Sequence, residues 1–223
     1  MGQGELALTP LQMANGMCMI ANKGYYYEPH FVKAIGKNPK DPLLAKYLKK
    51  NITKVPDTVF GLVQQAMQDV VESGTAAGAK LDGVTICAKT GTAENKAIVN
   101  GEVIKMQNHS MFVAFAPREN PKIAIAVAIE NAGFGATWAA PIASLLIEKY
   151  LFDSISTKRK PMEEKMINAH LINKYVYSID SVTRIHDAGV FRNKQERKRI
   201  ADSTVRATDS IMIMRLYENR FRH

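Results

Sequence analysis

Apolar positions in the first third of the chain recur every three to four residues, a spacing that predicts helices. Over residues 9–21 the apolar stripe opens on a Thr-x-x-Gln capping box, Thr9 to Gln12, with proline at the first helical position. A second stripe predicts a helix of about four turns, with Asp57 as its N-cap and Gly74 as its stop.

The stretch between these two helices has a different pattern. Residues 25–35 are rich in aromatic and β-branched side chains around Pro29, which predicts extended chain. Residues 36–57 are rich in Lys, Asn, Pro and Asp, and they predict a loop with at most a short helix at 43–49.

Three later segments predict adjacent strands, at 84–92, 110–116 and 122–129. The last of them alternates isoleucine or valine with alanine, so both of its faces are apolar and both are expected to be covered. Residues 117–121, Pro-Arg-Glu-Asn-Pro, predict the turn that joins the second and third strands. Residues 94–108 are polar and predict a loop or a loose hairpin.

A final helix is expected from about Trp138 to Phe152. The order of helices and strands predicts an α+β fold, an antiparallel sheet flanked by helices. After Phe152 the hydrophobic pattern becomes poor, and we place a domain boundary there, with residues 1–152 before it and 153–223 after it. The second part is predicted to be a basic extension that is poorly ordered or partly helical, with a short helix at 163–171.

Charge supports this division. The chain carries a net charge of +9, but residues 1–152 hold 15 Lys/Arg and 12 Asp/Glu, whereas residues 153–223 hold 15 and 9. The net charges are therefore +3 and +6, with the larger one in the shorter part. A basic tail can bind anionic lipid or nucleic acid, but more often it is a solvated segment, and no nucleic acid is expected as a partner.

Several classes of site are not indicated. Cys18 and Cys87 lie among apolar neighbours and are interpreted as buried thiols. No metal-ligand spacing is shown by His30, His170, His186 and His223. No metal and no cofactor are therefore expected. No apolar run approaches the length of a transmembrane helix, and the N-terminus shows no signal segment. Taken literally, the chain would stay in the cytoplasm; if it is a fragment, its targeting lies in other sequence.

The candidate chemistry lies at the end of the first predicted strand, in Lys89-Thr90-Gly91-Thr92-Ala93. Lys-Thr-Gly on a strand is one of three signatures of enzymes that penicillin acylates. The other two, Ser-x-x-Lys and a Ser-x-Asn element, do not occur in the 223 residues. An ordinary strand end is the alternative interpretation. Trp138 is interpreted as a core aromatic in preference to a substrate contact, His109 as a strand-end polar residue in preference to a neighbour of the site, and Phe134 as lining a cleft or packing.

Four pieces in order resemble class B penicillin-binding proteins, closest to the elongation-type penicillin-binding protein 2 group. The first is Gly2-Gln3-Gly4-Glu5-Leu6 through Thr9-Pro10-Leu11-Gln12-Met13-Ala14, and the second is the Lys-Thr-Gly strand. The third is Phe112 to Pro117 with Asn120-Pro121-Lys122, and the fourth is Asn131-Ala132-Gly133-Phe134-Gly135 leading to Ala139-Ala140-Pro141-Ile142. The resemblance covers residues 2–152 and implies an incomplete transpeptidase fold of the penicillin-binding protein and β-lactamase type.

The resemblance also implies a function. Such enzymes are serine DD-transpeptidases that cross-link peptidoglycan through an acyl-serine, with D-Ala-D-Ala stem peptides and β-lactams as ligands. It assigns Lys89 to the proton-transfer network, the hydroxyl of Thr90 or Thr92 to a ligand carboxylate, Gly91 to close approach, and the N–H of Thr92 to the oxyanion hole.

Without the serine, we expect this polypeptide by itself to be inactive. The complete protein is expected to be anchored in the inner membrane with a periplasmic domain, and to meet the cell-elongation machinery. Two alternatives stay open: a fragment of a serine β-lactamase, which shares Lys-Thr-Gly, and a non-catalytic basic interaction protein acting through residues 153–223.

Overall fold

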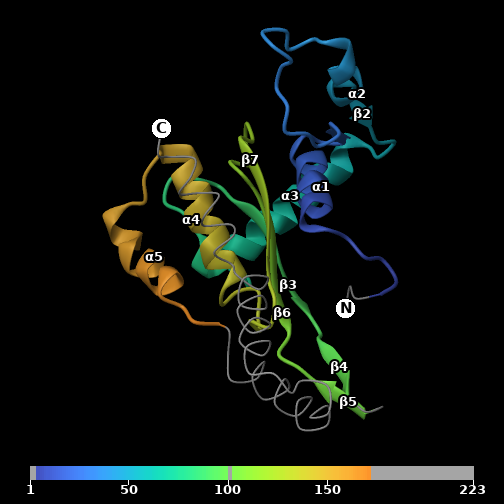
Figure 1. Ribbon diagram of the computed structural model, residues 1–223. Coiled ribbons are helices and arrows are strands. Elements are labelled where there is room, and N and C mark those ends of the chain that lie inside the picture. Colours follow the sequence, from blue (N-terminus) through green and yellow to red (C-terminus); the bar gives the residue numbers. More distant parts are fainter. Residues whose placement is uncertain (1–3, 100–101, 172–223) are drawn as a thin grey trace.

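A three-stranded antiparallel sheet lies at the centre of the molecule, and its strand order is β3-β6-β7. The computed structural model describes residues 4–99 and 102–171 (Figure 1). The strands are β3 (Cys87–Ala93), β6 (His109–Ala116) and β7 (Ile123–Ile129). They confirm the three predicted adjacent strands, although β3 begins three residues later than expected, after an isolated bridge between Leu81 and Val84.

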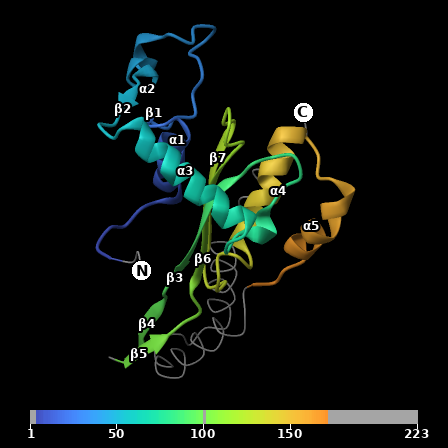
Figure 2. The same ribbon diagram turned by 180° about the vertical axis from the view of Figure 1, so that it is seen from behind.

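Helices cover the sheet from opposite sides, as the two views of the ribbon show (Figures 1 and 2). Helix α4 (Ala139–Phe152) packs on β6 and β7 from one side, and α1 (Pro10–Ala21) packs on the same two strands from the other. Helix α3 (Asp57–Glu72) runs beside β3. Both faces of β7 are therefore in contact with a helix, as its two apolar faces predict, and the alanines of this strand leave room for close packing.

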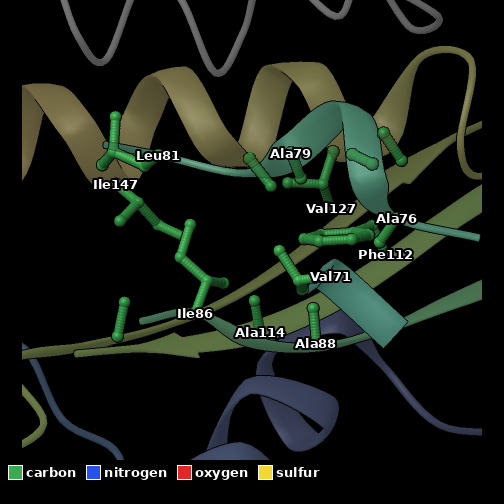
Figure 3. Close-up of a cluster of buried hydrophobic side chains, with 14 of the residues drawn as sticks. Val71, Ala76, Ala79, Leu81, Ile86, Ala88, Phe112, Ala114, Val127 and Ile147 are labelled. Carbon is green, nitrogen blue, oxygen red and sulfur yellow. The ribbon is translucent and has the colours of Figure 1, made fainter. Parts of the chain in front are cut away.

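The main core lies between the sheet and α4. Phe112, Ala114 and Val127 of the strands meet Ile147 of α4 and Val71 of α3 (Figure 3). A smaller cluster on the opposite face joins residues of the sheet to residues of α1 and α3, namely Cys87, Phe115, Ala21 and Met67. The α+β fold predicted from the sequence is thus confirmed.

The helix starts follow the predicted signals with one correction. Thr9 caps α1, and the reciprocal contacts of the capping box with Gln12 are both present. Asp57, in contrast, is the first residue of α3 and not its cap, because Pro56 holds the extended conformation that an N-cap position requires. The carboxylate of Asp57 therefore acts through the positive end of the helix dipole and forms no capping hydrogen bond.

Residues 25–55 follow the C-terminal end of α1 and project from the molecule as a lobe, at the top of Figure 1. A short ladder closes it, in which β1 (Tyr25–Tyr26) pairs with β2 (Asn51–Ile52). The predicted short helix appears as η1 (Pro42–Leu44) followed by α2 (Ala45–Leu48). The predicted extended stretch contains only the two residues of β1 as a strand, since no partner strand continues alongside it in the described lobe.

Past the Lys-Thr-Gly strand the chain forms a hairpin. Strands β4 (Lys96–Val99) and β5 (Glu102–Lys105) pair with each other, so the loose-hairpin alternative for 94–108 is the one observed. Ahead of β3, a short helix η2 (Ala77–Ala79) packs against both α3 and α4.

The chain continues beyond α4 into η3 (Thr157–Arg159) and α5 (Lys160–Ile167). Helix α5 starts three residues before the predicted helix and ends earlier, and Pro161 stands at its first turn. It packs against α4. The domain boundary after Phe152 stays a prediction, and most of the predicted extension, residues 172–223, lies outside the described residues. In the described part, no helix combines the length and apolarity needed to cross a bilayer.

Candidate active site

The candidate motif occupies the middle of β3, at one border of the sheet. Thr90 pairs with Phe112 of β6, and Thr92 pairs with Ser110. Across the described ranges no other strand pairs with β3, so its second side presents unpaired backbone groups. Such an edge can bind an extended peptide through main-chain hydrogen bonds.

Lys89 lies exposed on this edge. Its Nζ donates a hydrogen bond to the carbonyl oxygen of Thr90 at 2.7 Å, which places the ammonium group beside the outer border of the strand. Its partner in the ladder is Val113, whose side chain shares that face of the sheet and is half-buried. A positive charge therefore stands at the strand edge next to unpaired backbone groups.

The two threonines of the motif differ in their surroundings. The hydroxyl of Thr90 lies 2.7 Å from the hydroxyl of Thr75, which belongs to the loop between α3 and η2. Thr92 is exposed. Side chains alternate along a strand, so both threonines occupy the face opposite to Lys89.

The backbone of Thr92 has the direction that an oxyanion site needs. In an antiparallel ladder, every second residue of an edge strand points its N–H and C=O away from the partner. Because the carbonyl of Thr90 meets the Nζ of Lys89 on the outer side, the N–H of Thr92 shares that outward direction. The edge thus offers a fixed N–H donor close to a cation.

Two glycines allow the backbone around the motif to come close. A Cβ on Gly91 would lie 3.0 Å from the Cβ of Met111. A Cβ on Gly135, in the loop before α4, would lie 2.2 Å from the carbonyl oxygen of Met111 and 2.5 Å from that of Gly91. The loop therefore rests directly on the backbone of β3 and β6, and only glycine fits at position 135.

Ser110 fastens the same loop to the sheet. It is fully buried, its hydroxyl donates to the carbonyl oxygen of Phe134 at 2.9 Å, and the N–H of Ala139 donates to that hydroxyl at 3.2 Å. The sequence pattern assigned no role to Ser110, and it included Gly135 only as part of the loop at residues 131–135. A small hydroxyl residue at the start of a buried strand and a Gly-x-Gly loop are the only signals that the sequence carries for them.

The three ring side chains considered in the sequence analysis, His109, Trp138 and Phe134, lie near the start of β6 and in the segment before α4. The N–H of Asn131 donates to His109 Nδ1 at 3.1 Å. Trp138 packs against the main core, whereas Phe134 is 68% exposed. The two aromatics border an open hollow of about 370 Å³, which is also lined by Lys105, Met106, Gln107, Asn108, Ala132, Gly133 and Thr137.

The described residues supply a binding edge but no complete catalytic set. The hydroxyl of Thr90 contacts that of Thr75, and in the described part of the chain no hydrogen bond joins Thr90 or Thr92 to a general base. Within the described ranges no group of three His, Cys, Asp or Glu side chains is arranged to hold a metal ion. The arrangement can orient a ligand carboxylate and an oxyanion, as acyl-transfer enzymes do.

Comparison with known proteins defines the class. Residues 1–148 match the penicillin binding protein transpeptidase domain, and the chain belongs to this family. Its relatives include MrdA and PBP2 proteins, which confirms the resemblance to class B penicillin-binding proteins of the penicillin-binding protein 2 type.

The relatives are substantially longer than this chain. A peptidoglycan D,D-transpeptidase MrdA of Acinetobacter baumannii is 34% identical over 169 residues, which are 72% of this chain and 24% of that protein. MrdA of Haemophilus influenzae is 30% identical over 174 residues, covering 74% of this chain and 26% of its own length. The chain thus spans about a quarter of the length of these relatives.

Solved structures agree with the fold. The crystal structure of Pseudomonas aeruginosa PBP2 in complex with WCK 5153 superposes with a TM-score of 0.54 and 32% identity, over 70% of this chain and 33% of that one. Penicillin-binding protein A of M. tuberculosis, as an imipenem acyl-enzyme complex, gives a TM-score of 0.54 and 32% identity, over 67% of this chain and 32% of that one.

Proposed function

We propose that this chain forms part of a peptidoglycan DD-transpeptidase, the part that holds the substrate peptide and stabilises the oxyanion. One observation carries the proposal: Lys89-Thr90-Gly91-Thr92 lies on an open sheet edge in a chain whose first 148 residues match the transpeptidase family. The acyl-accepting serine and its lysine come from sequence outside these residues.

The proposed reaction is an acyl transfer in two steps. A serine oxygen attacks the carbonyl carbon between two D-alanines, the C–N bond breaks, and the proton from the serine leaves with the released D-alanine. An amine of a second stem peptide then attacks the carbonyl carbon of the ester, a new C–N bond forms, the C–O bond to the serine breaks, and the proton from the amine passes to the serine oxygen. Both steps pass through a tetrahedral oxyanion.

Lys89 and Thr92 have complementary roles in this scheme. The ammonium of Lys89 raises the positive potential at the edge and takes part in moving the serine proton. The N–H of Thr92 donates to the oxyanion, and its exposed hydroxyl donates to the terminal carboxylate of the peptide. We assign the carboxylate to Thr92 before Thr90, because Thr75 already engages the Thr90 hydroxyl.

β-Lactams are the corresponding inhibitors in this proposal, since the M. tuberculosis relative forms an acyl-enzyme with imipenem. The complete protein would work at the outer face of the inner membrane, where stem peptides are cross-linked, as part of the cell-elongation machinery. The isolated chain would not be acylated.

A chimeric enzyme tests the proposal. Residues 1–152 of this chain replace the matching segment of the Acinetobacter relative, and acylation by a fluorescent penicillin is followed over time. The chimera should be labelled, while the isolated chain should show no covalent adduct by mass spectrometry. Lys89→Ala in the chimera should slow acylation by about 100-fold or more, the range expected for losing a group that acts in the transition state.

Lys96→Ala is the matched control, because this lysine is also exposed but lies beyond β3. It should leave acylation unchanged. Equal rates for the chimera and its Lys89→Ala variant would remove Lys89 from the site. A penicillin adduct on a serine of the isolated chain would contradict the proposal that the nucleophile lies outside these residues. Rapid hydrolysis of the bound penicillin by the chimera would favour the β-lactamase alternative.

A further inference from the structure

The positive charge of the family-matching part is concentrated in the lobe at residues 25–55. The lobe contains seven lysines and two acidic residues, a net charge of +5. The remainder of residues 1–152 holds eight basic and ten acidic residues, a net charge of −2. The lobe that projects from the molecule (Figure 1) therefore carries a net positive charge, whereas the remainder of residues 1–152 is close to neutral.

The same lobe exposes large apolar side chains. Phe31 is 98% exposed, Leu43 is 76% exposed and Ile52 is 74% exposed. In the lobe, Leu44 is the one large apolar residue that the structure buries. A soluble surface rarely combines exposed aromatic and aliphatic side chains with a high density of lysine, unless a partner takes up both.

Contacts within the lobe hold part of this surface in place. The rings of His30 and Tyr47 stack at 4.7 Å between centroids, and Lys46 lies 3.6 Å from Glu28. These contacts fasten the segment that carries Phe31 to α2 (Ala45–Leu48), so Phe31 projects from an ordered support. Lys50 covers the ring of Tyr25 at 3.7 Å to its centroid.

We propose that the lobe binds the surface of a bilayer that contains anionic phospholipid. Lysine ammonium groups attract lipid phosphates, and an exposed phenylalanine inserts among the acyl chains near the headgroups. The aliphatic residues favour a bilayer over a soluble polyanion, because Leu43 and Ile52 gain burial among acyl chains and cannot stack on nucleic-acid bases as an aromatic ring can. This surface lies on a different element from the motif in β3, so it adds a second contact to the proposed enzyme.

Vesicle sedimentation with the full chain tests this proposal. The chain should pellet with vesicles of phosphatidylcholine and phosphatidylglycerol, and should stay in solution with phosphatidylcholine vesicles. Replacing Lys33, Lys37 and Lys40 by Gln should weaken binding by about fivefold for each charge, or about 100-fold together. Phe31→Ser should also weaken binding, although it changes no charge.

A second set of three exposed lysines outside the lobe provides the matched control, namely Lys96, Lys105 and Lys122, each replaced by Gln. Binding that falls equally in both triple variants would overturn the proposal, because it would then reflect net charge. Unchanged binding by the lobe triple variant would overturn the proposal, because the lysines beside Phe31 would then not contact the vesicle. Loss of binding in the lobe triple variant without any effect of Phe31→Ser would show attraction by charge without insertion of position 31, and would also overturn the proposal.

A fluorescence measurement makes the test independent of sedimentation. Trp138 is the single tryptophan of the chain, so Phe31→Trp in a Trp138→Phe background places the only indole in the lobe. Anionic vesicles should shift its emission to shorter wavelength, and brominated lipid should quench it. An unchanged spectrum with a retained circular dichroism spectrum would exclude insertion of position 31.

Discussion

Gly135 leaves no room for a side chain above Gly91: a Cβ at position 135 would stand 2.5 Å from the carbonyl oxygen of Gly91. These residues lie 44 positions apart, and their contact holds the loop before α4 against the strand that carries the candidate motif. The backbone of β3 is therefore supported from the face opposite to Lys89.

Gly135→Ala should be strongly destabilising. The clash is with backbone atoms of Met111 and Gly91, which cannot move without disturbing the ladder, so we expect a loss of about 2–4 kcal/mol in the free energy of unfolding. Gly61→Ala is the control, because a Cβ there meets nothing within 4 Å and alanine favours the helix by about 1 kcal/mol. Urea denaturation of both variants checks this, and equal stabilities would disprove the close contact.

Thr90 and Thr92 should respond differently to valine. In the chimeric enzyme, Thr92→Val should slow acylation by at least tenfold, because it removes the exposed hydroxyl assigned to the carboxylate. Thr90→Val should act mainly on stability, by about 1 kcal/mol, because it removes the partner of Thr75. Acylation rates and melting curves together separate the two. A larger kinetic effect for Thr90→Val would reverse the assignment.

Glu148 and Arg159 form an ion pair that joins α4 to the segment beyond it. The atoms Oε2 and Nη1 lie 3.1 Å apart, and the side chains are only 4% and 10% exposed. The Arg159 guanidinium also donates to the hydroxyl of Ser144 at 2.5 Å, and the N–H of Ser156 donates to Glu148 at 3.1 Å. Glu148→Gln should cost about 3–5 kcal/mol, because it leaves a buried cation uncompensated.

Asp82→Asn is the matched comparison, since Asp82 pairs with Lys158 of the same segment at 2.8 Å but both groups are exposed. It should leave the melting temperature unchanged. The double variant Glu148→Leu with Arg159→Met should regain much of the lost stability, because it removes both buried charges. If Glu148→Gln melts like the parent, the segment beyond α4 is not anchored as described.

Cys87 should resist alkylation. It is fully buried, its thiol donates to the carbonyl oxygen of Gln64 at 3.3 Å, and burial raises its pKa to about 11. A thiol with a raised pKa keeps its proton at neutral pH, so at pH 8 only about one molecule in a thousand carries the reactive thiolate. Iodoacetamide labelling followed by mass spectrometry should modify Cys87 only after urea unfolds the chain. Rapid labelling of the native chain would show that this face is open.

The chain should self-associate. On the face that carries Lys89, the residues Met111, Val113, Ala126 and Ala128 are only half-buried, because α1 covers one end of it. Leu62 of α3 is 73% exposed as well. Apolar surface of this extent favours association in water. Light scattering over a range of concentrations measures it, and a monodisperse monomer with a sharp thermal transition would show a self-sufficient core.

Local patterns in the sequence predict the main helices, the three adjacent strands and the family. The capping box at Thr9, the alternation in residues 122–129 and the Lys-Thr-Gly strand each depend on neighbours a few positions apart, so the amino-acid order carries them directly. The N-cap of α3 is Pro56 and not the predicted Asp57, because the fixed backbone conformation of Pro56 suits the position before the first helical residue.

Tertiary structure decided how these elements meet. Three contacts join residues that no local periodicity connects. They are the hydrogen bond between Thr75 and Thr90, the close approach of Gly135 to Gly91, and the ion pair of Glu148 with Arg159. The sequence shows seven lysines in residues 25–55, but only the folded chain shows that this segment projects as a lobe and exposes Phe31. Propensity and spacing act along the chain, whereas steric fit, buried charge and exposure depend on which surfaces the fold brings together.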